Sequence, residues 1–313
     1  MDWIIVLVGS ALFLTLLASF VCFMLTFYSP KRRPLGEDEY RIPPGKIYEP
    51  FREEMVGWAR EVRAMPHREM RVITEDGLVL RGRYFEYQKG AVTEILFHGY
   101  KGDADRDMNG AVKRCFAVGR NAILVDQRAS GKSDGHVITF GIKERHDAVL
   151  WAKEAVRVLG DDVRLILSGV SMGAATVMMA AVEELPPNVK AILADCGYSS
   201  AREIIRKVMK EMKVPVGLLY PFVRLGARLF GGFDPEETSP MAAMKKCRLP
   251  VIFFHGDRDA FVPHEMTERL YAACASEKKR FVSVPKAGHG LAFSVSKEAY
   301  LKAITDFAEE CEI

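Results

Sequence analysis

The longest hydrophobic run of the chain lies at its N-terminus, where residues 3–28 contain no charged side chain. As a helix this run would be about 39 Å long at about 1.5 Å per residue, enough to cross a hydrocarbon core of about 30 Å. Trp3 and Tyr28 lie at its ends, where aromatic rings favour the membrane interface. The pattern predicts a transmembrane anchor within residues 1–30. A cleaved signal peptide is the alternative, but the run lacks a positive n-region and a small-residue cleavage site.

The charges that flank this run predict its orientation. Lys31, Arg32 and Arg33 follow it directly, whereas the other end carries only Asp2 and the terminal amine. Positive residues next to a membrane helix favour the cytoplasmic side. We therefore expect a single-pass protein of the cell membrane with its globular part in the cytoplasm.

A connecting region follows over residues 31–68. Residues 30–50 hold five prolines and two glycines mixed with charged residues, a composition typical of a tether. Apolar residues then recur at helical spacing and predict an amphipathic helix over residues 50–64, with Phe51, Met55, Trp58, Ala59 and Val62 on one face. We expect this helix to pack on the flank of the domain that follows; a position on the membrane surface is the alternative.

From residue 69 onward, short apolar runs alternate with helical ones. Residues 69–74 and 78–87 alternate like two antiparallel strands around a Glu-Asp-Gly turn. Six further runs are almost continuously apolar, and each is followed by a helical pattern: 93–98, 121–126, 163–168, 190–195, 250–255 and 280–285. Strands of this kind are buried on both faces, which predicts an α/β domain over residues 69–313 with a mostly parallel eight-stranded sheet flanked by helices. The pattern does not give the order of the strands.

Composition excludes several classes of function. The net charge of +3, without a long basic block, gives no reason to expect nucleic acid as a partner. The six cysteines show no CxxC spacing, which suits a reducing compartment, and the seven histidines form no metal-binding motif. Gly131-Lys132-Ser133 resembles the end of a phosphate-binding loop, but the glycine required five residues earlier is Asp126, so we do not expect nucleotide binding.

Candidate chemistry gathers where the predicted strands end. The stretch Gly169-Val170-Ser171-Met172-Gly173 directly follows the strand 163–168 and opens a run of small helix-forming residues. A sharp strand-to-helix turn there would lift the serine hydroxyl above the sheet, and glycines are needed because such a turn crowds the neighbouring backbone. This context predicts a nucleophile at Ser171. A serine that caps the following helix is the alternative.

Three other strand ends carry polar residues. Asp257 and Asp259 both follow the strand 250–255, and their spacing alone does not separate them. His289 lies between glycines after the last strand and is free to reach across the strand ends. The glycine-rich turn after residues 93–98 can aim the backbone N–H of Tyr100 at an oxyanion, with His98 as a structural support.

These motifs, in this order, resemble those of the α/β-hydrolase superfamily, and in particular its small esterase and peptidase-like serine hydrolases. The resemblance rests on HGY at 98–100, DQR at 126–128, GVSMG at 169–173, HGDRDAFVP at 255–263 and GHG at 288–290, and it covers about residues 69–310. It implies the α/β-hydrolase fold and selects Asp259 as the acid. It also implies a catalytic triad of Ser171, His289 and Asp259, an oxyanion hole formed by the backbone N–H groups of Tyr100 and Met172, and no cofactor.

The segment between the strands 190–195 and 250–255 is about 54 residues long, more than a parallel crossover needs. Within it, residues 214–232 are apolar on more than one side. We expect a helical cap over about residues 199–246 that covers the catalytic mouth and lines an acyl pocket. Such a cap favours a small-molecule acyl substrate with a lipophilic or aromatic portion. Packing of these residues on the core alone is the alternative.

The predicted function is therefore that of a carboxylesterase-like serine hydrolase that cleaves an ester, or a thioester or amide, through an acyl-enzyme. The same triad serves peptidases and acyltransferases, and the sequence does not choose among them. From other classes, the chain could be a membrane-tethered scaffold that kept the fold without catalysis, or a carrier of a lipid ligand. The presence of Ser171, Asp259 and His289 argues against the scaffold, and the carrier is the third alternative.

Overall fold

The computed structural model describes residues 2–313 except 32, 34 and 37, so that Arg32 of the expected orientation signal lies outside the described residues. An eight-stranded sheet forms the centre, with strand order β1-β2-β4-β3-β5-β6-β7-β8. Its strands are β1 (Arg68–Ile73), β2 (Val79–Phe85), β3 (Thr93–Phe97), β4 (Asn121–Val125), β5 (Leu165–Val170), β6 (Val189–Asp195), β7 (Val251–Gly256) and β8 (Lys279–Val284). β2 is antiparallel to both β1 and β4, and the remaining pairs are parallel. The predicted α/β fold class is confirmed.

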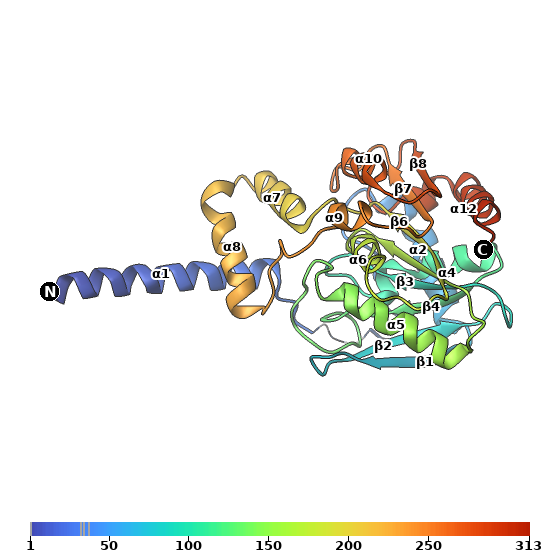
Figure 1. Ribbon diagram of the computed structural model, residues 1–313, viewed down its shortest axis with the longest axis horizontal. Coiled ribbons are helices and arrows are strands. Elements are labelled where there is room, and N and C mark those ends of the chain that lie inside the picture. The colour runs from blue at the N-terminus through green and yellow to red at the C-terminus, as the bar shows by residue number, and fades with distance from the viewer. Residues whose placement is uncertain (1, 32, 34, 37) are drawn as a thin grey trace.

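Helices cover both faces of the sheet (Figure 1). One face carries α5 (Glu144–Leu159), α6 (Met172–Ala180), α9 (Pro240–Met244) and α10 (His264–Ala273). The other carries α2 (Arg52–Ala64), which follows the short helix η1 (Glu49–Phe51), together with α3 (Ala104–Asp107), α4 (Asn109–Ala117), α11 (Ala292–Val295) and α12 (Lys297–Cys311). The amphipathic helix expected over residues 50–64 is thus present, and it packs on the flank of the domain against α4. Apolar clusters fill the space on both faces of the sheet.

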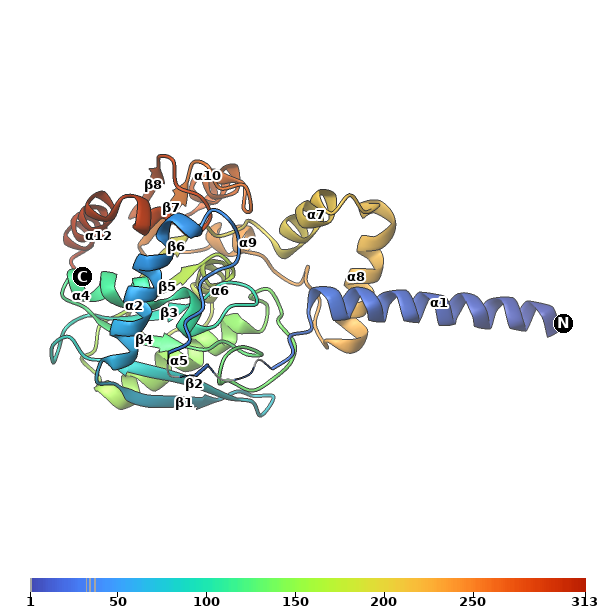
Figure 2. The same ribbon diagram turned by 180° about the vertical axis from the view of Figure 1, so that it is seen from behind.

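The N-terminal helix α1 (Asp2–Thr26) projects from the body of the molecule (Figures 1 and 2). Its residues Trp3–Thr26 form the one helix in the described part of the chain that is long and apolar enough to cross a membrane. Its last turns are packed on the globular domain, where Phe23 and Phe27 are buried. The chain continues into a bridge between Tyr28 and Val137, so α1 ends against the domain and not in a free linker.

Helix α8 (Val216–Phe230) lies beside α1, and α7 (Ala201–Glu211) packs on α8. The two helices belong to the insertion expected over residues 199–246. Both views show α8 crossing α1 where α1 meets the body (Figures 1 and 2). A side chain at Gly226 of α8 would collide with the Ser19 carbonyl of α1, so only glycine allows this close approach.

A buried charge cluster ties β3 to the helical layer. The carboxylate of Glu94 is fully buried and accepts hydrogen bonds from Arg114 at 2.5 Å and from Arg120 at 2.6 Å. Burial alone would raise the pKa of Glu94, but the two guanidinium groups outweigh it and hold that pKa below its usual value. The cluster therefore depends on a charged glutamate between two buried arginines.

We expect Glu94→Gln to lower the free energy of unfolding by about 3–5 kcal/mol, because it leaves two buried guanidinium groups without their countercharge. Thermal unfolding of the full chain in detergent measures this loss. The matched control is Glu69→Gln on the exposed side of β1, which should change stability by less than about 0.5 kcal/mol. Equal melting temperatures for the two variants would contradict the role assigned to the cluster.

Candidate active site

Ser171 lies on a sharp turn between β5 and α6. Its φ and ψ angles are 56° and −115°, a backbone conformation that is strained for a residue with a side chain. A side chain at Gly169 would overlap the backbone of Gly173, and one at Gly173 would overlap the carbonyl of Phe97. The two glycines are therefore required by the close passage of β5, α6 and β3, as the sequence pattern predicted.

The structure brings Ser171, His289 and Asp259 into one hydrogen-bonded line. Nε2 of His289 lies 2.9 Å from Oγ of Ser171, and Nδ1 of the same ring lies 2.7 Å from Oδ2 of Asp259. Asp257, the other carboxylate that the sequence left open, instead accepts a hydrogen bond from the backbone N–H of Lys286 at 2.6 Å. The geometry thus selects Asp259 as the partner of the histidine.

Hydrogen bonds keep the carboxylate of Asp259 charged and set the tautomer of His289. The backbone N–H groups of Phe261 and Val262 both donate to Asp259 at 2.8 Å, and Nε2 of His255 lies 3.1 Å from its other oxygen. Burial would raise the pKa of Asp259, but the hydrogen bonds from His255 and His289 outweigh burial and hold that pKa well below its usual range. Because a carboxylate only accepts, Nδ1 of His289 must donate to it, which leaves Nε2 of the neutral ring free to accept the serine proton.

The two residues expected to form an oxyanion hole lie next to Ser171. Met172 is the first residue of α6, so its N–H belongs to the first turn, which has no acceptor within the helix. Tyr100 lies in the turn after β3, where the neighbouring N–H of Gly99 donates to Asp107 at 3.2 Å. Whether these two N–H groups hold an oxyanion stays a prediction.

Gln127 holds the turn after β3 in place, a role that the sequence reasoning missed. Its side-chain N–H donates to the carbonyl of His98 at 2.6 Å, and its backbone N–H donates to Nε2 of the same residue at 3.1 Å. Its side-chain oxygen accepts from Thr176 of α6 at 3.2 Å. One glutamine therefore connects the Tyr100 turn to the helix behind the serine. Its place two residues after the end of β4 was the available signal.

A cavity of about 590 Å³ opens above Ser171. Its walls come from residues 43–48 and from Tyr100, Phe261 and His289, and they are mostly apolar. Among the described residues, none from the expected cap over 199–246 lines this cavity. The insertion lies beside the site, where α8 packs on α1 and α7 packs on α8, so the expectation that the cap lines the acyl pocket is wrong.

The segment 43–48, expected to be part of a tether, covers one side of the cavity. The Tyr48 ring is buried, and its hydroxyl donates to the carbonyl of His289 at 3.0 Å. Burial raises the pKa of Tyr48 well above its usual value, so the hydroxyl stays neutral and keeps donating. Prolines and glycines occur both in free linkers and in segments that are packed on a domain. Composition alone therefore did not distinguish a linker from a segment that covers the cavity.

The end of α1 touches the site directly. The Tyr100 hydroxyl donates to the carbonyl of Thr26 at 2.6 Å, and the Lys101 ammonium donates to the carbonyl of Leu25 at 3.1 Å. The Phe140 ring packs against the rings of both Tyr100 and Phe27. Its centroid lies 4.9 Å from that of Tyr100 and 5.7 Å from that of Phe27. The proposed oxyanion turn is therefore packed against the last turn of the apolar helix.

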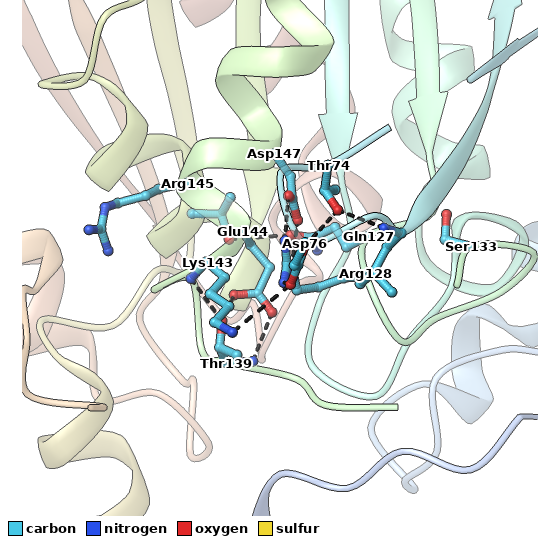
Figure 3. Close-up of polar contacts among 12 residues, drawn as sticks. Thr74, Asp76, Gln127, Arg128, Ser133, Thr139, Lys143, Glu144, Arg145 and Asp147 are labelled. Atoms are coloured by element: carbon cyan, nitrogen blue, oxygen red, sulfur yellow. Dashed lines mark hydrogen bonds and ion pairs between the residues drawn. The ribbon is translucent and has the colours of Figure 1, made fainter. Parts of the chain in front are cut away.

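An ionic network holds the loop that carries Phe140 (Figure 3). Arg128 donates two hydrogen bonds of 2.7 Å to Asp147 and a third, of 2.9 Å, to Asp76 (Figure 3). Glu144 accepts from the backbone N–H of Thr139 at 2.8 Å and from its hydroxyl. These contacts close the loop from both ends, and so they fix the Phe140 ring that packs against both Tyr100 and Phe27.

One group of potential metal ligands occurs in the described part of the chain. It comprises Cys196, Asp259 and His289, whose ligand atoms lie within 4.8 Å of one another. Burial raises the pKa of the Cys196 thiol well above its usual value, which disfavours the thiolate that a metal requires. Asp259 and His289 already hydrogen-bond each other. This set fits a serine-centred site better than a metal centre.

Part of the chain matches a known family of hydrolases. Residues 166–291, less than half of the chain, match the family Serine hydrolase (FSH1). The chain is similar to the uncharacterized protein YqkD of Bacillus subtilis, at 26% identity over 61% of this chain and 63% of that protein. It is also similar to the protein bem46 of Schizosaccharomyces pombe, at 25% identity over 71% of this chain and 68% of that protein. The chain thus spans less than two thirds of the length of YqkD.

Solved structures share the fold. An esterase of Pyrococcus furiosus, Pf2001, superposes with a TM-score of 0.65 at 22% identity, covering 87% of this chain and 98% of that one. Alpha/beta hydrolase domain-containing protein 10 from mouse gives a TM-score of 0.55 at 18% identity, covering 78% of this chain and 99% of that one. The fold is that of the α/β-hydrolases, and the family match supports hydrolase activity.

We expect Asp259→Asn to lower stability at pH 7 by about 1.5–3 kcal/mol, because the carboxylate accepts several buried hydrogen bonds. The folded pKa of Asp259 lies below the unfolded value of about 3.9, so its contribution is complete above that pH and is lost as the pH falls toward the folded pKa. The difference in melting temperature from wild type should therefore shrink between pH 7 and pH ~3. Asp257→Asn is the control and should change the melting temperature little at either pH. A difference in melting temperature between Asp259→Asn and wild type that stays constant with pH would argue against a charged Asp259.

Proposed function

We propose that this chain is a serine hydrolase that cleaves an ester bond through an acyl-enzyme on Ser171. The observation that carries the proposal is the line from Oγ of Ser171 to His289 and on to Asp259, with contacts of 2.9 Å and 2.7 Å, on a strained turn at the carboxyl end of the sheet. A serine that merely capped α6 would accept a hydrogen bond from the first turn, and its side chain makes none.

In the first half of the reaction, Oγ of Ser171 attacks the ester carbonyl carbon while Nε2 of His289 takes the hydroxyl proton. The carbonyl oxygen becomes an oxyanion, which the backbone N–H groups of Tyr100 and Met172 stabilise. Asp259 stabilises the charged imidazole that results. When the carbon–oxygen bond to the alcohol breaks, the imidazolium returns the proton to the leaving alkoxide, and the acyl group remains on Ser171.

In the second half, water replaces the alcohol. Nε2 of His289 takes a proton from the water as its oxygen attacks the acyl carbon, and the same two N–H groups hold the second oxyanion. The bond between the acyl carbon and Oγ of Ser171 then breaks, and Oγ takes the proton back from the imidazolium. The products are a carboxylic acid and free enzyme, without any cofactor.

The cavity supports a lipophilic acyl or alcohol portion. Its walls include the apolar side chains of Pro43, Pro44, Ile47 and Phe261. The Phe261 ring lies 5.0 Å from the ring of His289, so apolar surface begins next to the reacting atoms. A peptidase or acyltransferase would use the same triad, and the substrate panel below distinguishes them from an esterase.

The apolar helix α1 supports attachment to a membrane. An 18-residue window within Trp3–Thr26 has a mean hydropathy of 2.6, and only 6% of that window is buried, as a span through lipid requires. Because its last turn packs against Tyr100, the helix is a structural part of the enzyme in this proposal and is not a removable signal. Lys31 and Arg33, which follow it, favour a cytoplasmic position of the catalytic domain.

We expect Ser171→Ala to abolish ester hydrolysis and labelling by a fluorophosphonate probe while leaving the melting temperature within a few degrees of wild type, because the substitution removes only the nucleophile. Gel fluorescence of the labelled full chain measures this. Ser283→Ala, an exposed serine on β8, is the matched control and should label like wild type. Labelling that persists in Ser171→Ala would refute the assignment of the nucleophile.

For p-nitrophenyl esters of increasing acyl length, we expect kcat/KM to rise by up to about fourfold per methylene group until the cavity is filled, since each buried methylene contributes about 0.8 kcal/mol. A parallel panel of peptide substrates and of alcohol acceptors tests the peptidase and acyltransferase alternatives. Turnover confined to very small polar esters would contradict the lipophilic cavity.

A further inference from the structure

Helix α8 has two apolar faces, and only one of them is covered by the protein. Tyr220, Val223 and Ala227 are buried against α1, α7 and the loop that carries Phe140. On another side, apolar residues recur at spacings of four, three and four and so share one face: Leu218, Phe222, Leu225 and Leu229. The side chains at the two ends of this stripe are 64% and 52% exposed, and the middle two are half-buried. Exposed leucines in such a row are unusual for a surface in water.

This stripe is continuous with the exposed surface of α1. Gly226, directly after Leu225, touches the Ser19 carbonyl of α1. The ring of Phe230, directly after Leu229, lies 5.2 Å from that of Phe20 and is itself 41% exposed. The apolar stripe of α8 thus runs directly beside the proposed membrane span.

The position of the contact along α1 sets the depth of α8. Ser19 and Phe23 lie 16 and 20 residues beyond Trp3, which at about 1.5 Å per residue is about 24–30 Å along the helix. A hydrocarbon core is about 30 Å thick, so α8 meets α1 where the span would leave the acyl chains. Because α8 crosses α1 (Figures 1 and 2), a span along the membrane normal would leave α8 lying along the membrane surface.

The charges around the stripe fit the headgroup region. The turn between α7 and α8 exposes Lys210 and Lys213 on either side of Met212, whose side chain is 64% exposed. The neighbouring acid, Glu211, is paired with Lys207 at 2.6 Å. Arg228 is paired with Asp234. Two exposed lysines next to exposed apolar residues are typical of a segment that lies in the interface of a membrane with anionic lipids.

We propose that α8 and the turn before it, residues 210–230, form a second membrane contact that lies in the bilayer interface beside α1. The inference rests on the proposed membrane span of α1. Its occupant is the phospholipid surface itself, with Leu218, Phe222, Leu225 and Leu229 among the acyl chains and Lys210 at the headgroups. Two contacts fix the tilt of the domain, which one helix alone leaves free.

Contacts of α7 connect the proposed membrane surface to the wall of the Ser171 cavity. Lys207 of α7 donates to the carbonyl of Ala260 at 2.5 Å, and its ammonium lies 5.5 Å from the ring of Phe261, which lines the cavity. Tyr100, on another wall, bonds to the end of α1. Membrane contact at α1 and α8 therefore holds the mouth of the Ser171 cavity near the lipid surface, where an ester dissolved in the membrane reaches it.

The depth of α8 is tested with the full chain in vesicles of phosphatidylcholine and phosphatidylglycerol. A fluorophore is attached at Leu229→Cys in a background that carries Cys22→Ser and Cys311→Ser, since the other four cysteines are buried. Nitroxide groups on the lipid acyl chains should quench it strongly. The control position is Tyr87→Cys. Tyr87 is half-exposed and its N–H donates to Asn121 at the start of β4, at the end of the sheet away from Ser171. A fluorophore at position 87 should not be quenched.

Equal quenching at the two positions would overturn the proposal. Weak quenching at position 229 together with cross-linking between two labelled chains would also overturn it, because the stripe would then be covered by a second copy of the chain. This measurement needs no enzymatic activity, so its outcome is independent of the proposed function.

The effect on catalysis is tested with the double variant Leu218→Asp and Leu229→Asp. Turnover of a membrane-dissolved ester in vesicles should fall about tenfold, because the variant loses two apolar contacts with the membrane. A tenfold change corresponds to about 1.4 kcal/mol. Turnover of a short soluble ester should not change. Tyr87→Asp, the matched control, should alter neither activity. An equal fall for both esters in the double variant would overturn the proposal, whereas a wild type inactive on both would refute the proposed function and leave the depth measurement to decide.

Discussion

The arrangement of this protein depends on the backbone turn at Ser171. Three elements, β5, α6 and β3, pass so close together there that Gly169 and Gly173 admit no side chain. This crowding forces the serine into a left-handed conformation with φ of 56°, and the packed sheet on either side offsets the strain. The hydroxyl is thereby held at the carboxyl edge of the sheet, within 2.9 Å of His289. The other parts of the site are arranged around that fixed point.

Segments from outside the sheet complete the site. Residues 43–48 cover one side of the cavity, and the Tyr48 hydroxyl is bonded to the backbone of His289. The end of α1 is bonded to Tyr100 on the other side. The apolar helix and the catalytic site are consequently one packed unit, with the ring of Phe140 packed against both Tyr100 and Phe27. A change in the position of α1 would be transmitted to the proposed oxyanion turn.

Local patterns were sufficient to predict the strands and the residues at their ends. All eight strands lie within a few residues of the predicted runs, because continuous apolar stretches have few alternatives to a buried strand. Ser171 was recognisable from the glycines around it. His289 gained weight only from the serine and the acid at the other strand ends, and Asp259 needed the family resemblance to be separated from Asp257. Features that depend on distant contacts were not predictable: the strand order, the placing of Tyr48 over the site, and the packing of α8 on α1. Each of these joins residues more than 100 positions apart or depends on which faces of the domain are already filled.

In the proposed reaction, Ser171 carries an acyl group during turnover. The most direct measurement is mass spectrometry of the full chain quenched in acid during steady-state hydrolysis of a p-nitrophenyl ester, followed by digestion. We expect the peptide containing Ser171 to gain the mass of the acyl group less one hydrogen, and we expect this adduct to disappear when the ester is exhausted. Turnover without an adduct, or with the adduct on a different residue, would contradict it.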